Sequence, residues 1–134
     1  VVGAHLGSLG HDVTQVAERL DRYPNFAVDI SARLDDLIAQ KRETVREFFC
    51  SYPERIIFGT DVVSRSPSSS LSPHGRRSLE AGLRATWERY WRYLETPETS
   101  TPDGRTVPGL ELPGDVLDRV YVENARSWFP GLIG

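Results

Sequence analysis

The sequence predicts an α/β fold with about three parallel strands surrounded by helices, and two observations support this prediction. First, residues 1–4, 26–30 and 56–58 are short apolar runs with little polar alternation. Such runs are typical of parallel strands that are covered on both faces. Second, helical patterns separate the three runs, so that strand and helix alternate along the chain as they do in α/β proteins.

The first helix is expected to follow Asp12, because an aspartate side chain can accept from the free N–H groups of a first helical turn. Pro24 should end it, because the residue before a proline avoids the helical region. A longer helix is expected from about Asp35 to Tyr52, before Pro53. The apolar residues of these two helices recur at helical spacing: Val13, Val16, Ala17 and Leu20, then Leu34, Leu37, Ile38, Val45, Phe48, Phe49 and Tyr52.

The composition changes after the third run, and residues 64–78 and 96–112 read as irregular loop segments rich in serine, threonine and proline. The "PDG" at 102–104 favours a turn at the tip of a small hairpin. A helix is expected from about Leu79 to Leu94 and a last one over 113–129. The first of these has an apolar side that we expect to meet the core or another subunit: Leu83, Trp87, Tyr90, Leu94 and, beside them, Trp91.

The chain has 134 residues and a formal charge of −3, which suits a single domain and gives no support for nucleic-acid binding. No apolar run approaches the roughly 18 residues of a membrane-spanning helix. Cys50 is the only cysteine, which fits a reducing compartment, and we expect a cytoplasmic protein. Methionine is absent and the first residues already resemble a strand, so we interpret the chain as part of a longer protein.

Each predicted strand has a residue that can do chemistry at or near its end: His5, Asp29 and Asp61. Their separations of 24 and 32 residues are close to the roughly 30 residues of one strand–helix–strand step. Parallel strands end at one edge of a sheet, so an imidazole and two carboxylates should meet there. We expect the Asp61 carboxylate to be partly desolvated, with a divalent metal as one compensating partner. Alternatively, these side chains only cap loops.

Four segments resemble, in this order, the C-terminal part of the amidohydrolase-related family, whose members are TIM-barrel metal-dependent hydrolases and decarboxylases. The segments are "VVGAHLGS", "YPNFAVDIS", "YPERIIFGTD" and "GLELPGDVLDRVYVENARSWFP". "AHLG" is similar to the sixth barrel strand, where "HGG" is commoner, so Leu6 is a departure. "FAVDIS" and "RIIFGTD" are similar to the seventh and eighth strands, and "ENARSWF" to the final helix. The resemblance implies the C-terminal portion of a (β/α)8 TIM barrel over residues 1–134.

The resemblance also implies roles for individual residues. Asp61 matches the aspartate that binds the metal and acts as a base, and His5 matches a histidine that polarises or positions substrate or water. Asp29 and Arg33 would line the substrate side. The implied cofactor is a divalent metal, expected to be zinc, and the implied partner is a small-molecule substrate rather than a nucleic acid or a membrane. A homo-oligomer of the intact enzyme stays one of the open alternatives.

The family's metal site also uses a His-x-His pair and a histidine on the fifth strand, and this sequence has neither. Its histidines are His5, His11 and His74. We therefore expect the metal site to be incomplete and the isolated chain to be inactive. The expected function is part of a hydrolase acting on C–O or C–N bonds, or of a decarboxylase of small carboxylic acids. The alternative is a non-catalytic α/β interaction domain.

Overall fold

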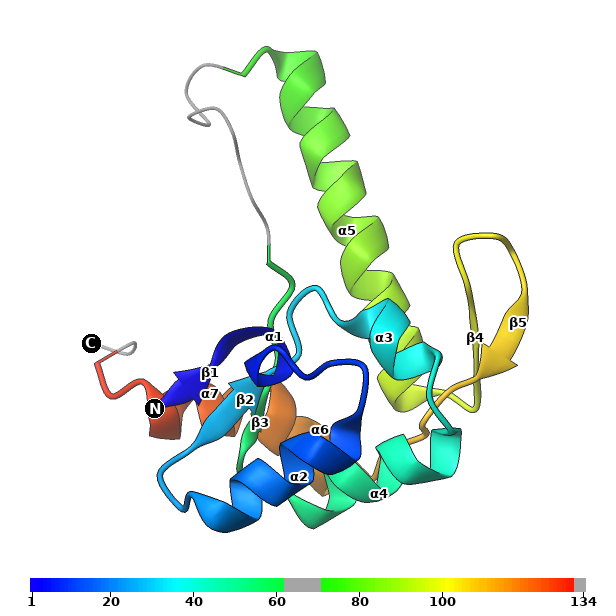
Figure 1. The fold of residues 1–134 in the computed structure, drawn as a ribbon. Coiled ribbons are helices and arrows are strands. Elements are labelled where there is room, and N and C mark those ends of the chain that lie inside the picture. Colours follow the sequence, from blue (N-terminus) through cyan, green and yellow to red (C-terminus); the bar gives the residue numbers. More distant parts are fainter. Residues whose placement is uncertain (62–70, 132–134) are drawn as a thin grey trace.

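The computed structural model describes residues 1–61 and 71–131, and its centre is a three-stranded parallel sheet (Figure 1). The strands are β1 (Val2–Gly3), β2 (Ala27–Asp29) and β3 (Ile56–Ile57), in the order β1-β2-β3. Both pairings are parallel. The predicted α/β class and the three predicted strands are thus confirmed, while closure of a barrel needs more strands than these.

Helix α2 (Val13–Arg22) begins and ends where the sequence predicts. Asp12 is its N-cap, and one carboxylate oxygen accepts from the backbone N–H of Thr14 at 2.9 Å. Hydrogen bonds from the side chains of Thr14 and Gln15 lower the pKa of Asp12 to about 2. The cap therefore stays ionised at neutral pH, where a negative charge favours a helix N-terminus.

The single helix expected over residues 35–52 is instead two helices, α3 (Leu34–Ile38) and α4 (Arg42–Ser51). The prediction of one continuous helix is therefore wrong between Ile38 and Arg42. The Gln40 side chain accounts for the break. Its Oε1 accepts from the backbone N–H of Val13 at 2.9 Å, and its Nε2 donates to the carbonyl of Gly10 at 2.8 Å. The turn between α3 and α4 is therefore held by the start of α2, and α2 packs along α4.

Helix α5 (Pro73–Glu95) starts earlier than the expected Leu79, so residues 73–78 are helical rather than part of a loop. Ser72 caps it by accepting from the backbone N–H of Gly75 at 3.1 Å. The rest of the predicted serine-rich loop, through residue 70, lies outside the described residues. Strands β4 (Glu98–Ser100) and β5 (Thr106–Pro108) then form the predicted hairpin.

The predicted last helix is a continuous helical segment with one wider turn in its middle. It consists of α6 (Gly114–Asp118), a π-helical turn over 119–123, and α7 (Asn124–Trp128). Asn124 is buried, and its side-chain amide donates to the carbonyls of Pro53 at 2.7 Å and Ile56 at 2.8 Å. This amide joins the end of the chain to β3 and gives the "ENA" segment a structural role.

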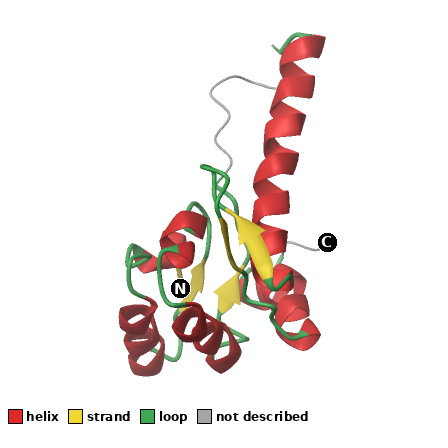
Figure 2. Cartoon of the chain, turned by 90° about the vertical axis from the view of Figure 1, so that its right-hand side faces the viewer, coloured by secondary structure: helices red, strands yellow, loops and turns green. Residues whose placement is uncertain are grey.

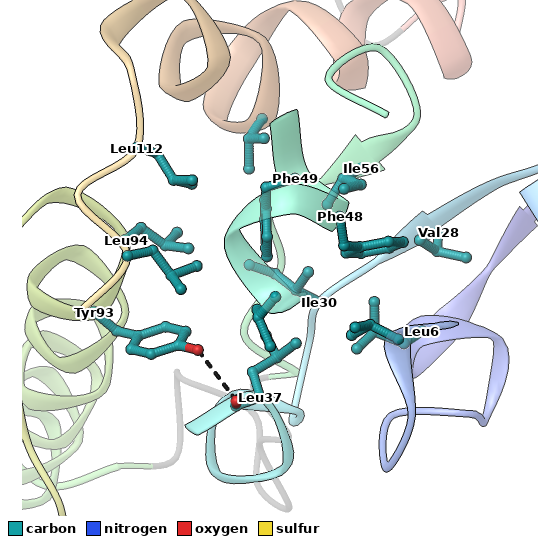
Figure 3. Packing of buried hydrophobic residues seen from close by; sticks show 14 of the residues in the cluster. Leu6, Val28, Ile30, Leu37, Phe48, Phe49, Ile56, Tyr93, Leu94 and Leu112 are labelled. Atoms are coloured by element: carbon teal, nitrogen blue, oxygen red, sulfur yellow. Dashed lines mark hydrogen bonds between the residues drawn. The ribbon is translucent and has the colours of Figure 1, made fainter. Parts of the chain in front are cut away.

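The hydrophobic core lies between the sheet, α4 and the C-terminal part of α5 (Figure 3). Its largest fully buried side chains include Tyr93, Phe49 and Leu94. The Tyr93 hydroxyl donates to the carbonyl of Leu37 at 3.1 Å, and the Tyr90 hydroxyl donates to the carbonyl of Ile30 at 3.0 Å. Burial raises the pKa of both phenols above their ordinary value.

We expect the chain to lose stability as the pH rises above 10.0, the ordinary pKa of tyrosine. Above that value an unfolded tyrosine loses its proton while buried Tyr90 and Tyr93 keep theirs, so ionisation stabilises the unfolded state. The measurement is urea unfolding over a series of alkaline pH values. Tyr93→Phe should flatten this dependence, and at neutral pH it should lower the unfolding free energy by about 1 kcal/mol, because one buried hydrogen bond to the Leu37 carbonyl is lost.

The exposed Tyr23 provides the matched control, because Tyr23→Phe removes a phenol that is open to solvent. That variant should keep the wild-type dependence on pH. If Tyr93→Phe leaves the alkaline loss of stability unchanged, that loss does not come from the buried tyrosines as we expect.

Candidate functional site

The three strands end at one edge of the sheet, which we call the strand-end edge. Val28 is paired with Gly3 on one side and with Ile56 on the other, so the residues that follow each strand emerge together. His5, Asp29 and Asp61 therefore lie in three neighbouring segments (Figure 1). The expectation that parallel strands deliver these segments to a common edge is confirmed by this register.

Asp29 and His5 are joined directly at this edge. One oxygen of the Asp29 carboxylate, Oδ1, accepts from the backbone N–H of His5 and from that of Ser31, each at 3.0 Å. The Ser31 hydroxyl donates to the same oxygen. This single oxygen thus holds the segment after β1 against the segment after β2.

The His5 ring is held by Ser31. Its Nδ1 lies 2.9 Å from the Ser31 carbonyl oxygen and 3.0 Å from the Ser31 Oγ. A carbonyl oxygen can only accept, so Nδ1 must carry a proton. In the neutral ring Nε2 is then the unprotonated nitrogen. A fixed Nδ1–H donated to a backbone carbonyl is the arrangement that orients histidines acting as bases or metal ligands.

Ser31 is the site residue that sequence reasoning missed. It is a buried polar residue, with 7% of its surface exposed, and it contacts both His5 and Asp29. Because its hydroxyl donates to Asp29, the three side chains are not arranged as a serine nucleophile with a histidine base. The signal in the sequence was the pair of polar residues Asp29 and Ser31, placed two apart at the end of an apolar strand.

The backbone is left-handed after every strand of this sheet. The single turn α1 (Ala4–Gly7) contains His5 and Leu6, each with φ of 56°. Ala32 follows β2 with φ of 52°, and Asp61 follows β3 with φ of 55°. Non-glycine residues adopt this conformation uncommonly, at a cost of order 1–3 kcal/mol each, and such residues are often found at functional sites.

Burial of its side chain explains why Leu6 tolerates the left-handed backbone conformation. The family's commoner glycine at this position would take a positive φ without strain, whereas leucine cannot. However, the Leu6 side chain is fully buried and belongs to the hydrophobic core that Figure 3 shows. Burial of a leucine stabilises the fold by about 1.5–3 kcal/mol, enough to offset the backbone cost.

Asp61 is exposed, so the expectation that its carboxylate would be partly desolvated is wrong for this chain. It follows Gly59, where the end of β3 approaches β2 closely. A Cβ on Gly59 would lie 3.2 Å from the Ser31 Cβ. Gly59 therefore places β3 close to Ser31, while Asp61 lies two residues farther along, on the solvent side of the strand-end edge.

Arg33 also reaches this edge. Its Nε donates to the His5 carbonyl at 3.3 Å, and its Nη1 lies 3.3 Å from the Asp36 carboxylate. One third of the Arg33 side chain stays exposed. In contrast, His11 is exposed near the start of α2 and His74 is exposed in the first turn of α5.

The described residues 1–61 and 71–131 contain no group of three His, Cys, Asp or Glu side chains that could hold a metal ion. Nor does any helix in these ranges have the length and apolar character needed to cross a membrane. His5 and Asp61 supply two donor types that divalent metals accept, but not a complete ligand set.

A family model described as amidohydrolase matches residues 1–131. The chain belongs to the amidohydrolase family. The resemblance inferred from the four sequence segments is thereby confirmed. Family membership indicates a hydrolase-type enzyme with a TIM barrel, commonly with divalent metals, and the three parallel strands are consistent with part of such a barrel. No curated protein and no solved structure matches the chain.

We expect the neutral His5 ring of this amidohydrolase chain to carry its proton on Nδ1, as nitrogen NMR of ¹⁵N-histidine-labelled protein would show. The Asp29→Ala variant should lose this preference, because it frees the backbone of His5 and Ser31 and the Ser31 hydroxyl. Its ring signals should move toward those of a mobile histidine. His11→Gln and His74→Gln, which replace exposed side chains, would assign the His5 signals.

Asp103→Ala is the matched control. Asp103 is an exposed carboxylate in the hairpin that accepts from Thr101 and Arg105, so its loss removes comparable local bonds away from His5. It should leave the His5 signals unchanged. Protonation of His5 on Nε2 in the neutral wild-type protein would contradict the assigned tautomer.

Proposed function

We propose that this chain supplies part of the active site of a metal-dependent enzyme that hydrolyses C–O or C–N bonds or decarboxylates small carboxylic acids. The observation that supports it is the His5 ring, held through Nδ1 by Ser31 so that Nε2 is left for another partner. Family membership supports the same chemistry. In this proposal His5 and Asp61 are the catalytic residues and the strand-end edge is the part of the site that this chain provides.

The donor types fit a divalent metal such as zinc only in part. Asp61 is an exposed carboxylate at the strand-end edge, and we propose it as the metal ligand of this chain. The remaining ligands would come from segments of the intact enzyme that carry a His-x-His pair. When bound, the metal would polarise a substrate carbonyl and lower the pKa of a water molecule.

Each residue of the strand-end edge has its own task in this proposal. The Asp61 carboxylate accepts a proton, and its exposure leaves it accessible to substrate and water. His5 donates or accepts a hydrogen bond through Nε2 and so orients the reacting group. Asp29, whose Oδ1 is already occupied by backbone and hydroxyl donors, acts through His5 and is a positioning residue.

Arg33 is a cation at the strand-end edge. We propose that its partly exposed guanidinium pairs with a carboxylate group of the substrate, for which planar two-point hydrogen bonding is well suited. Its existing bond to the His5 carbonyl would keep it next to the reacting group. A decarboxylase substrate always offers such a carboxylate, so this contact would be most useful in that reaction.

The alternative of a non-catalytic interaction domain has one observation in its favour. Asp29 makes the loop hydrogen bonds that a purely structural aspartate would make. The same alternative gives no reason for a fixed His5 tautomer or for an exposed Asp61 in a left-handed conformation. The enzyme interpretation accounts for all three residues.

We expect the 134-residue chain alone to show no hydrolysis or decarboxylation and no tight stoichiometric zinc binding, because most of the ligand set is missing. Zinc titration followed by an activity screen tests this. In the intact enzyme, Asp61→Asn and His5→Gln should each lower kcat by roughly 10²-fold or more, since each removes a group that handles a proton. Asp103→Asn, in the distant hairpin, should not.

Tight one-to-one zinc binding with turnover by the isolated chain would contradict the incomplete site. An intact enzyme that keeps full kcat after Asp61→Asn would contradict the role given to that residue.

A further inference from the structure

Helix α5 has two parts with different surroundings. Its buried residues are Tyr90, Tyr93 and Leu94, all near its C-terminal end. The part before Arg89 projects away from the body of the molecule (Figures 1 and 2). Among the described residues, no hydrogen bond joins residues 73–88 to the sheet or to the helices around it.

Helix α5 presents an apolar stripe, defined by Leu79, Leu83, Trp87 and Trp91, which are spaced by four residues along one side and lie mostly on the projecting part. Trp87 is 38% exposed and Trp91 is 41% exposed, and their ring centroids lie 6.4 Å apart. A shallow groove follows the stripe and is also lined by Glu80, Arg84 and Glu88. Two neighbouring exposed tryptophans on a stripe of this kind indicate an interaction surface.

A row of charges that alternate in sign runs beside this stripe, again with four-residue spacing: Arg76, Glu80, Arg84, Glu88 and Arg92. Suppose that α5 of a second copy lies antiparallel to the first, with Thr86 of one copy opposite Thr86 of the other. Arg84 of each helix then faces Glu88 of the other. The same alignment places Glu80 opposite Arg92. If the two helices ran parallel and in register, each charged residue would face the same residue of the other copy and repel it. The row therefore favours the antiparallel arrangement.

The same alignment brings the two apolar stripes together at their centre. Trp87 is one residue from the midpoint at Thr86, so the Trp87 side chains of the two copies lie close to the two-fold axis. Rows with four-residue spacing pack into each other at an angle near −50°, which brings the central turns of the two helices together. An interface in which residue i meets residue j, and j meets i, closes with two-fold symmetry and forms a dimer.

We propose that the apolar stripe of α5 binds a second copy of this chain in an antiparallel, two-fold symmetric dimer. The sign alternation is self-complementary, and that is the reason for choosing a second copy over an unrelated partner. The contact is restricted to one helix of each copy, so the association should be reversible and weak, in the micromolar range.

The first test is sedimentation velocity of the 134-residue chain over a series of concentrations. The wild type should pass from monomer to dimer, and its tryptophan emission should shift to shorter wavelength over the same range. Trp87→Ala combined with Trp91→Ala should abolish the dimer. Because these side chains are outside the core, circular dichroism should confirm that the variant stays folded.

The second test uses charge reversal. Arg84→Glu alone and Glu88→Arg alone each create two like-charge contacts across the proposed interface, and each should weaken the dimer roughly tenfold. A mixture of the two variants should regain the wild-type affinity, because every contact between unlike chains is again attractive. Rescue by mixing excludes an effect within one helix, since mixing changes nothing within a chain.

Arg126→Glu and Glu123→Arg make the same charge changes on exposed residues of the last helical segment and serve as controls. A wild-type chain that stays monomeric throughout overturns the proposal. So does a dimer that survives the loss of both tryptophans, or one that charge reversal does not weaken, because another surface, such as a sheet edge, would then hold the copies together.

Discussion

The parallel pairing of β2 with both of its neighbours is the constraint on which the rest of the structure depends. Parallel strands all end at the same edge, so the three segments that follow them must share it. If β1 or β3 ran the other way, His5 or Asp61 would lie at the opposite end of the sheet. The buried apolar runs that favour parallel strands therefore also decide which polar residues can meet.

The strand-end edge combines backbone strain with unusually concentrated hydrogen bonding. A left-handed non-glycine residue costs about 1–3 kcal/mol, and each of the three strand ends has at least one. The Asp29 carboxylate accepts several hydrogen bonds there, and bonds to a charged group contribute about 1.5–3 kcal/mol each. The fold thus keeps His5 and Ser31 in fixed positions at little net cost, as a preorganised site requires.

Sequence patterns predicted what depends on neighbours along the chain and missed what depends on distant ones. The Asp12 cap, the strands and the hairpin turn are local features. The break between α3 and α4 is not, because Gln40 bonds to Val13 and Gly10, which lie 27 and 30 residues earlier in the chain. The role of Ser31 likewise needed the position of His5. Asp61 was expected to be desolvated, but its exposure depends on which segments surround the strand-end edge.

Helix α5 illustrates the same limit within one element. Its pattern predicted one apolar side holding Leu83, Trp87, Tyr90 and Leu94, yet the structure buries Tyr90 and Leu94 and leaves Trp87 exposed. The four residues share one side of the helix, since seven residues are close to two turns of a helix of 3.6 residues per turn. The difference arises because the helix projects beyond the body of the molecule, so the same side is covered near its C-terminal end and uncovered before it (Figures 1 and 2). One continuous helix can then belong to the core at one end and offer a separate binding surface at the other.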